Sequence, residues 1–575
     1  MAAVPRDIDS FNSRKPVLRR YNVERSCIRC HERKIRCDRK TPCSTCTKAN
    51  AQCQYPGPEK GRRRSKREQQ SQLVPRIDEH DDHLDVTRSS QELSPAIPTG
   101  NQKTQNVSEG QSLDSNRGFL LKDGASTRYI NEGLLSQVLE KETELQSAID
   151  TPGSVGTLEP RAPTLGFRGL ISIPCIVTTD LSTLYPSRWQ ATRLWHVWLN
   201  NVNPVLKLLH IPTIQPAFFA AINSPAQVSA DFSALLFSIY FAAVTSIDSS
   251  EAALILGQCH QAALNNFQYG LELSLHNAGF LDSPTIASVQ AMSMYLTCRR
   301  NHNSGRSGWA LNGLLVRASQ SIGLHRDGEH FNLPPLDCEI RRRLWWHVSG
   351  LDGRVAEDHG IIIGGLGTLC DTKLPLNIDD ADLIACMKDP PQPKKGATEM
   401  SLSLILAESN VTTQEIHHIM SRGQNGDEKV AHLKQILQDF KARMEEQYFQ
   451  YLDINIPIQR YALLLGRMQL AKMEVMARQQ YLRGKSVEKS SELACDESLM
   501  YAIEVLEKNI MLKTDDLLRN FQWLASSFAQ YSALTHVLWH LCVWPESQNT
   551  DKVWSIVERS FELEELPSFP GLNQK

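Results

Sequence analysis

From about Tyr185 onward, apolar residues recur every three or four positions, the spacing that places them on one face of an α-helix. Strand-like alternation is nearly absent from this part of the chain, and no long internal period repeats, so a solenoid is not indicated. The predicted helices span residues 188–200, 231–247, 251–277, 284–299, 306–322, 338–358, 399–420, 427–449, 457–482, 493–512, 515–543 and 551–561. The pattern predicts a large all-α domain with its core at about residues 185–545.

The N-terminal part of the chain lacks this periodicity. Residues 1–20 are polar, and residues 68–125 are rich in Gln, Ser, Asp, Asn and Gly, so neither segment could bury much apolar surface. An amphipathic helix is predicted at 126–149, where Ser126 or Thr127 would cap a stripe of about three turns. We therefore expect a disordered segment at 1–20, a cysteine-rich module at 21–56, a basic and then polar disordered linker at 57–125, and the all-α domain at 126–575.

The charge is distributed very unevenly between these segments. Residues 1–67 carry 19 Lys and Arg against six Asp and Glu, a net charge of +13, whereas the remaining residues carry a net charge of −15. A basic arm on an acidic body is typical of a polyanion-binding head joined to a body that contacts proteins. This part of the sequence therefore points to nucleic acid as a partner.

No segment has the pattern of a secretory leader or a membrane span. The first twenty residues include several charges and no apolar stretch. The longest apolar run, Phe232–Ile247, is shorter than the roughly 20 residues of a spanning helix and contains three serines and one threonine. We expect that run to form a buried helix, and the protein to be made in the cytosol without a membrane partner. Thiols stay reduced there, which favours metal binding over disulfides for clustered cysteines.

Six of the fourteen cysteines form a regular cluster, Cys27, Cys30, Cys37, Cys43, Cys46 and Cys53. The spacing C-x2-C-x6-C occurs twice with five residues between the copies. Structural zinc binds four ligands in a tetrahedron, so six thiolates complete two sites if two sulfurs are shared. Since Cys27 and Cys43 open the two halves of the repeat, we predict that they bridge two Zn²⁺ ions. About 30 residues bury too little core to fold alone, so the metal must supply folding energy.

Three other interpretations of the cysteines explain less. Cys27-Ile28-Arg29-Cys30-His31 has the C-x-x-C-H pattern of haem attachment, which leaves four cysteines unused and requires an exported protein. A thioredoxin-like C-x-x-C requires a βαβ context that is missing. A zinc ribbon with one ion would leave two thiols without a role. The eight remaining cysteines are scattered singly and indicate no metal chemistry.

The segment CIRCHERKIRCDRKTPCSTCTKANAQCQYP resembles the fungal Zn2Cys6 binuclear zinc cluster. The resemblance includes the basic run after the second cysteine, Asp38 after the third and Pro42 before the fourth. It implies a short helix in the major groove of double-stranded DNA, commonly at a CGG-like triplet. By position, Lys34 is the expected base-reading residue, with Arg33 beside it, and Arg36 and Arg39 are expected to contact phosphates. His31 stands where relatives usually have Arg.

A second basic run follows the cluster. It consists of Lys60, Arg62, Arg63, Arg64, Lys66 and Arg67. Its position beside the predicted DNA-binding module favours a nuclear localisation signal or an arm that tracks phosphates. We therefore expect the protein to act in the nucleus.

The predicted helical domain resembles the fungal-specific transcription factor domain, also called the middle homology region, in GWALNGLLVRASQSIGLHRDGE, EIRRRLWWHVSGLDGRVAEDHG and KLPLNIDDADL. Arg341, Arg342 and Arg343 with Glu339 are predicted to form the charged face of one helix, with Trp345 on its buried side. Because Trp345 and Trp346 are adjacent, one is expected to face the core and the other a neighbouring helix or a pocket, both as packing residues rather than ligand-binding ones. No nucleophile elbow, P-loop, HExxH helix or dinucleotide fingerprint occurs, so no enzyme is predicted.

These resemblances imply a sequence-specific DNA-binding regulator of RNA polymerase II genes, with a body for homodimerisation and coregulator binding. The single-domain layout favours a regulator of one secondary-metabolite gene cluster. Alternatives are a regulator of nutrient catabolism and a nuclear zinc scaffold that recruits partners. A scaffold would not need Arg33 and Lys34, which distinguishes it from a DNA reader.

Overall fold

The computed structural model divides the chain into two compact units, Met1–Ser108 and Glu109–Lys575. In the first unit it describes residues 27, 29–30, 33, 37–38, 42–49 and 51–53. In the second it describes residues 119–123 and 126–130 as backbone, and 181–302, 306–359, 370–421, 426–481, 496–543 and 550–564. The predicted segment 1–20 and the basic arm at 60–67 lie outside the described residues.

The buried cluster in the described part of the first unit consists of cysteine side chains. Cys27, Cys30, Cys43 and Cys46 are buried, with Cys37 and Cys53 packed against them. Arg29 and Cys30 are helical, and the short helix α2 spans Ser44–Lys48. The module has no aliphatic core among these residues, as the sequence predicted for a domain that depends on metal.

The second unit contains a two-stranded antiparallel hairpin, β1 (Phe119–Asp123) and β2 (Ser126–Ile130), in which Phe119 pairs with Ile130. β1 lies in the predicted disordered linker, and β2 occupies the predicted start of a helix, so both predictions are wrong for these residues. Ser126–Ile130 contains Thr, Tyr and Ile, which favour strands, and the pairing with β1 satisfies its backbone. The rest of the predicted helix, 131–149, lies outside the described residues.

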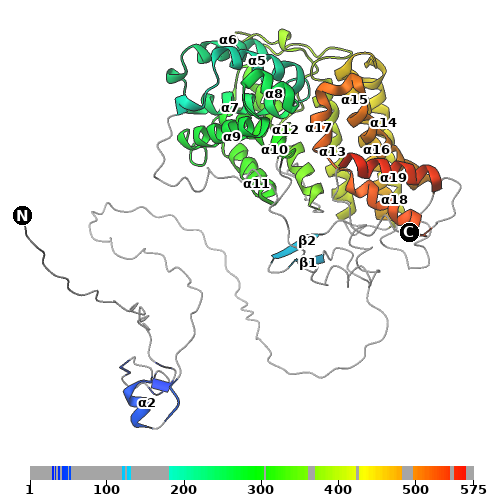
Figure 1. Cartoon of the computed structure of the whole chain (residues 1–575). Helices are drawn as coiled ribbons and strands as arrows, with labels where there is room; N and C mark the ends of the chain where they lie inside the picture. Colours follow the sequence, from blue (N-terminus) through cyan, green and yellow to red (C-terminus); the bar gives the residue numbers. More distant parts are fainter. Residues whose placement is uncertain are drawn as a thin grey trace, which may run out of the picture. The chain divides into compact units, whose positions relative to one another are not determined.

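Most of the rest of the described second unit is helical (Figure 1). They are α5 (Arg188–Val197), α6 (Ile211–Asn223), α7 (Ala230–Thr245), α8 (Ser249–Leu256), α9 (His260–Asn277), α10 (Ile286–Arg299), α11 (Arg306–Ser321), α12 (Pro335–Asp358), α13 (Ser401–Ser421), α14 (Gly426–Gln447), α15 (Pro457–Tyr481), α16 (Asp496–Thr514), α17 (Gln522–Ser526), α18 (Tyr531–Val543) and α19 (Thr550–Glu564). The prediction of a small cysteine module and a large helical body is therefore confirmed.

Three differences from the predicted helices have local causes. Helix α6 was missed because Pro212 and Pro216 interrupt the helical pattern, although the first stands in the opening turn where proline is tolerated. The helix predicted at 251–277 is divided into α8 and α9 by Gly257, whose φ of 67° ends α8 in a left-handed conformation. The helix predicted at 515–543 is divided into the 3-10 turn Asp516–Phe521, α17 and α18.

Helix α7 lies at the centre of an N-terminal group of helices, α5 to α12, and packs against α5, α9 and α10. It is buried from Ser233 to Thr245. This confirms that the longest apolar run is a buried helix. Helix α9 approaches α7 closely at Gly270, where an added Cβ would lie 2.6 Å from the ring of Phe237. No helix in the described part of the chain is long and apolar enough to cross a membrane.

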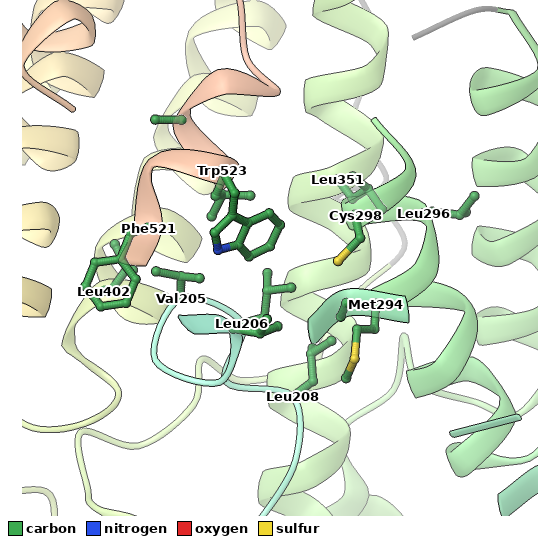
Figure 2. Close-up of a cluster of buried hydrophobic side chains, with 14 of the residues drawn as sticks. Val205, Leu206, Leu208, Met294, Leu296, Cys298, Leu351, Leu402, Phe521 and Trp523 are labelled. Carbon is green, nitrogen blue, oxygen red and sulfur yellow. The ribbon is translucent and has the colours of Figure 1, made fainter. Parts of the chain in front are cut away.

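Residues 203–210 connect the helical turn Trp198–Val202 to α6, and through side-chain contacts they join two groups of helices, the N-terminal group (α5 to α12) and a C-terminal group (α13 to α19). Figure 2 shows Val205, Leu206 and Leu208 of this segment in one buried cluster with Trp523 and Met294. The Trp523 indole N–H donates to the Asn201 carbonyl at 3.0 Å, and all of these apolar side chains are buried. The two helical groups therefore share one core.

Helix α12 carries two ion-pair networks that the sequence pattern did not predict. Arg342 pairs with Asp327 at 2.8 Å, and Arg343 pairs with Glu339 at 3.1 Å and with Asp380 at 2.6 Å. Both arginines and these three carboxylates are buried. The predicted charged face is thus wrong, because pairing allows these charges to lie in the interior.

The adjacent tryptophans of α12 have different surroundings. Trp345 is buried and donates its indole N–H to the Cys370 sulfur at 2.8 Å. Trp346 is only half-buried, and it lines a cavity while its indole N–H donates to the Lys373 carbonyl at 2.9 Å. This confirms the prediction that one of the two tryptophans faces the core and the other a neighbouring helix or a pocket.

Candidate metal centre and nucleic-acid interface

The six cysteines predicted to bind metal converge in the first unit. Their sulfur atoms form two overlapping groups of four, Cys27, Cys30, Cys37 and Cys43, and Cys27, Cys43, Cys46 and Cys53. Within each group all four sulfurs lie within 4.8 Å of one another. Only Cys27 and Cys43 belong to both groups.

The sulfur spacing fits zinc. A regular tetrahedron with Zn–S bonds of about 2.3 Å has S···S edges of about 3.8 Å. The Sγ atoms of Cys27 and Cys43 are 3.8 Å apart, those of Cys30 and Cys43 are 3.6 Å apart, and those of Cys27 and Cys46 are 3.7 Å apart. The last two pairs correspond to each other in the sequence repeat, so the distances reflect its approximate two-fold symmetry.

Backbone donors orient the sulfurs of the second half. The Cys43 sulfur accepts from the Cys46 N–H at 3.3 Å and caps helix α2, while the Cys53 sulfur accepts from the Cys43 N–H at 3.3 Å. The Asp38 carboxylate accepts from the Ser44 N–H at 3.1 Å, which connects the two halves of the repeat. Such hydrogen bonds favour the thiolate form and hold its lone pairs toward a metal.

The same contacts shift the pKa values of the thiols in opposite directions. Burial raises the pKa of Cys43, but hydrogen bonds from the Cys46 backbone and from neighbouring thiols outweigh it and lower the pKa to about 6. Burial is the largest influence on Cys30 and raises its pKa to about 12. Because zinc binds thiolates, metal binding must release protons from this cluster, and its affinity should fall at acidic pH.

Of the predicted DNA-contacting residues, the structure describes only Arg33. Its side chain is exposed, and its backbone N–H donates to the Arg29 carbonyl at 3.1 Å, continuing the helical turn that begins at Arg29. His31, Lys34, Arg36 and Arg39 lie outside the described residues, as do the six residues of the basic arm at 60–67.

Sequence reasoning missed one contact of the module. The Arg29 guanidinium donates to the Cys46 sulfur at 3.8 Å and is half-buried. A basic residue between the first two cysteines was the only available signal. This contact places a positive charge beside a cluster whose six thiolates and two zinc ions would sum to −2.

Two overlapping four-sulfur groups in a basic module, followed by a large helical unit, define a class of binuclear zinc-cluster regulators. Residues 25–62 match the fungal Zn(2)-Cys(6) binuclear cluster domain, and residues 195–449 match the fungal specific transcription factor domain. The chain therefore belongs to the fungal Zn(2)-Cys(6) transcription factors, DNA-binding regulators whose cluster holds two zinc ions.

Several curated proteins are similar along much of the chain. The aurofusarin cluster transcription factor of Gibberella zeae is 25% identical over 95% of this chain and 76% of its own length. The transcriptional regulator AacuB of Aspergillus aculeatus is 25% identical over 94% of this chain and 77% of its own. The pyriculol/pyriculariol biosynthesis cluster transcription factor 1 of Pyricularia oryzae is 31% identical over 66% of this chain and 52% of its own.

Proposed function

We propose that this protein is a nuclear transcription factor that binds CGG-like triplets and controls the genes of one secondary-metabolite biosynthetic cluster. The overlapping sulfur groups carry the DNA-binding part of the proposal, because they supply the ligand set of a binuclear zinc cluster. Relatives named for the aurofusarin and pyriculol/pyriculariol clusters support the part that concerns the pathway.

In this proposal one zinc ion is held by Cys27, Cys30, Cys37 and Cys43, and the other by Cys27, Cys43, Cys46 and Cys53. Zinc supplies the free energy that folds the module, since the buried cluster among its described residues consists of cysteines. Cys27 and Cys43 act as the bridges because each belongs to both sulfur groups. The bridging sulfurs thereby make the two sites interdependent.

DNA recognition is assigned to the basic residues that follow the second cysteine. Lys34 and Arg33 read the triplet in the major groove, and Arg36, Arg39 and His31 contact the sugar-phosphate backbone. The exposed side chain of Arg33, on the turn that begins at Arg29, supports this assignment. The basic residues at 60–67 are proposed to continue the phosphate contacts and to direct nuclear import.

The helical unit is proposed to act through binding rather than catalysis. It would support homodimerisation, which sets the spacing of two triplets, and it would contact coregulators. Its acidic character supports a protein-facing role, since the chain beyond residue 67 carries a net charge of −15.

Binding to DNA can be tested by fluorescence anisotropy with full-length protein on duplexes that contain or lack a CGG triplet. Lys34→Ala should reduce discrimination between these duplexes by about 1–3 kcal/mol. Lys48→Ala is the matched control, because Lys48 is exposed on α2 and its loss removes the same charge. It should weaken binding to both duplexes equally. Unchanged discrimination in Lys34→Ala would contradict the assignment.

The pathway can be tested by chromatin occupancy of the tagged protein in its own host. Peaks over CGG-like triplets in the promoters of one co-located biosynthetic gene set would support the proposal. Peaks at scattered catabolic genes would instead indicate a regulator of nutrient use. Nuclear protein without sequence-specific peaks would favour a scaffold.

A further inference from the structure

The helical unit contains a cavity of about 350 Å³ where its two groups of helices meet. The wall consists mainly of residues from α12, α13 and α15, with Val205 to Leu208 contributing from the segment that joins the groups. Most of it is apolar, and Met420, Met468 and Met476 supply flexible side chains. This volume and lining are typical of sites for small organic molecules.

Two glycines of α12 keep part of this space open. Gly350 and Gly353 both line the cavity, and neither has a positive φ that would require glycine. A Cβ on Gly350 would meet no atom of a neighbouring element within 4 Å. Glycine inside a helix costs roughly 0.5–1 kcal/mol relative to alanine. The helix therefore carries a stability cost at a position where a larger side chain has room.

Charged groups gather at one part of the wall. Glu357 accepts from Arg354 at 2.9 Å and from Lys472 at 2.5 Å, so one carboxylate is shared by two cations. The side chains of Glu357 and Lys472 retain 35% and 16% of their surface, and both residues line the cavity. Burial raises the pKa of Glu357, but Arg354 and Lys472 outweigh it and lower that pKa, whereas burial lowers the pKa of Lys472. Both side chains therefore keep accessible surface while forming part of the cavity wall.

The other charged groups of the wall already have partners. Lys207 and Arg343 both pair with Asp380, at 3.0 and 2.6 Å. Asp352 accepts from the Asn312 amide at 2.8 Å, and burial raises its pKa. Asp358, which also acts on Lys472, is paired with Arg300, so Arg354 and Lys472 share the single carboxylate of Glu357 and leave an excess of one positive charge there.

We propose that this cavity binds a small, largely apolar organic anion, such as an aromatic carboxylate, with its acidic group beside Arg354 and Lys472. The apolar wall would take the body of the molecule. The acidic group would give the two cations a second negative partner. This assigns the helical unit an effector site, which is independent of the residues proposed to read DNA.

The proposal can be tested with two probes of nearly equal shape, 2-naphthoate and 2-naphthamide. Isothermal titration of full-length, zinc-loaded protein should show one naphthoate per chain, bound about tenfold more tightly than the neutral amide. That ratio is expected when a charge-assisted hydrogen bond replaces a neutral one. No saturable binding of naphthoate, or equal affinity for the two probes, would overturn the proposal.

Three variants locate the binding. Lys472→Met should retain naphthamide binding and lose the preference for naphthoate, while Glu357 keeps Arg354 as a partner. Gly350→Leu should fill the space and block both probes, whereas Gly350→Ala adds one methyl group and should bind both. Unchanged binding in Gly350→Leu would place the probes elsewhere and overturn the site. All three changes leave the cysteine module intact, so DNA binding by the same variants tests the proposed function separately.

Discussion

Replacement of Cys43 with alanine should remove both zinc ions, whereas replacement of Cys37 should remove only one. The difference follows from membership of the two sulfur groups, because Cys43 belongs to both and Cys37 belongs only to the first. The two changes remove the same side chain from the same module. Any difference in zinc content therefore reports the position of the cysteine in the cluster.

The magnitude can be worked from the sulfur positions. Without Cys43 each group retains three sulfurs, and helix α2 also loses the sulfur that accepts from the Cys46 N–H at 3.3 Å. Without Cys37 the second group keeps all four. Since structural zinc contributes about 10–16 kcal/mol to the folding of small zinc modules, three-ligand sites should lose most of that free energy. We expect near-zero zinc per chain in Cys43→Ala and about one in Cys37→Ala.

The assay is zinc content by mass spectrometry after dialysis against buffered free zinc. If the whole module unfolds in Cys37→Ala, cadmium-113 substitution of the unaltered protein provides a second measurement. The β-protons of Cys27 and Cys43 should then couple to two cadmium nuclei, and those of the other four cysteines to one. Coupling of Cys43 to a single cadmium, or one zinc retained in Cys43→Ala, would refute the bridging assignment.

Three further predictions concern the helical unit. Arg343→Met should lower the free energy of unfolding by about 3–5 kcal/mol, because its two buried carboxylate partners lose a cation. Asp327→Asn should lower the free energy of unfolding by about 2 kcal/mol at neutral pH. Burial raises the pKa of Asp327, but hydrogen bonds from Arg342 and from backbone N–H groups outweigh burial and hold the pKa at about 2. Gly270→Ala should lower the free energy of unfolding by about 1–3 kcal/mol, because the added methyl group would be too close to the Phe237 ring. All can be measured by urea unfolding.

Tryptophan fluorescence reports the unfolding of the helical unit alone in these experiments, because all ten tryptophans lie at Trp189 or later. The stabilisation from Asp327 is present above its unfolded pKa of about 3.9 and is lost as pH falls toward 2, so the Asn variant and the unaltered protein should converge there. A constant difference down to pH 2 would contradict that cause. Arg343→Lys is the control, because it keeps a positive charge at the same position. If Arg343→Met and Arg343→Lys lower the free energy of unfolding equally, charge is not the property that stabilises this site.

The cysteine module shows how much a short motif specifies. The repeat C-x2-C-x6-C, its basic residues and a length too short to bury a core were enough to predict a binuclear zinc site and the two cysteines shared by its sulfur groups. Few residue types bind zinc, so the spacing of cysteines along the chain directly indicates a zinc site. The Arg29 contact to the Cys46 sulfur was not predictable, because it depends on how the two halves fold against each other.

In the helical unit, periodicity determined the class of structure and most helices, since each helix buries one face of its own sequence. It did not reveal α6, which contains two prolines, or the hairpin at 119–130, whose strands depend on pairing with each other. The local sequence pattern reflects the intrinsic preference of each segment for helix or strand. These elements form instead because of the segments that pack or pair with them.

The sequence by itself predicted zinc, a cluster of six cysteines to bind it and a mainly helical body. Only the tertiary structure decided that Arg343 and Glu339 are interior ion partners and that Trp346 lines a cavity. It also brought Glu357 of α12 to Lys472 of α15, 115 positions later. Burial of charge and the opening of internal space depend on contacts between distant segments, and no local spacing in the chain encodes those contacts.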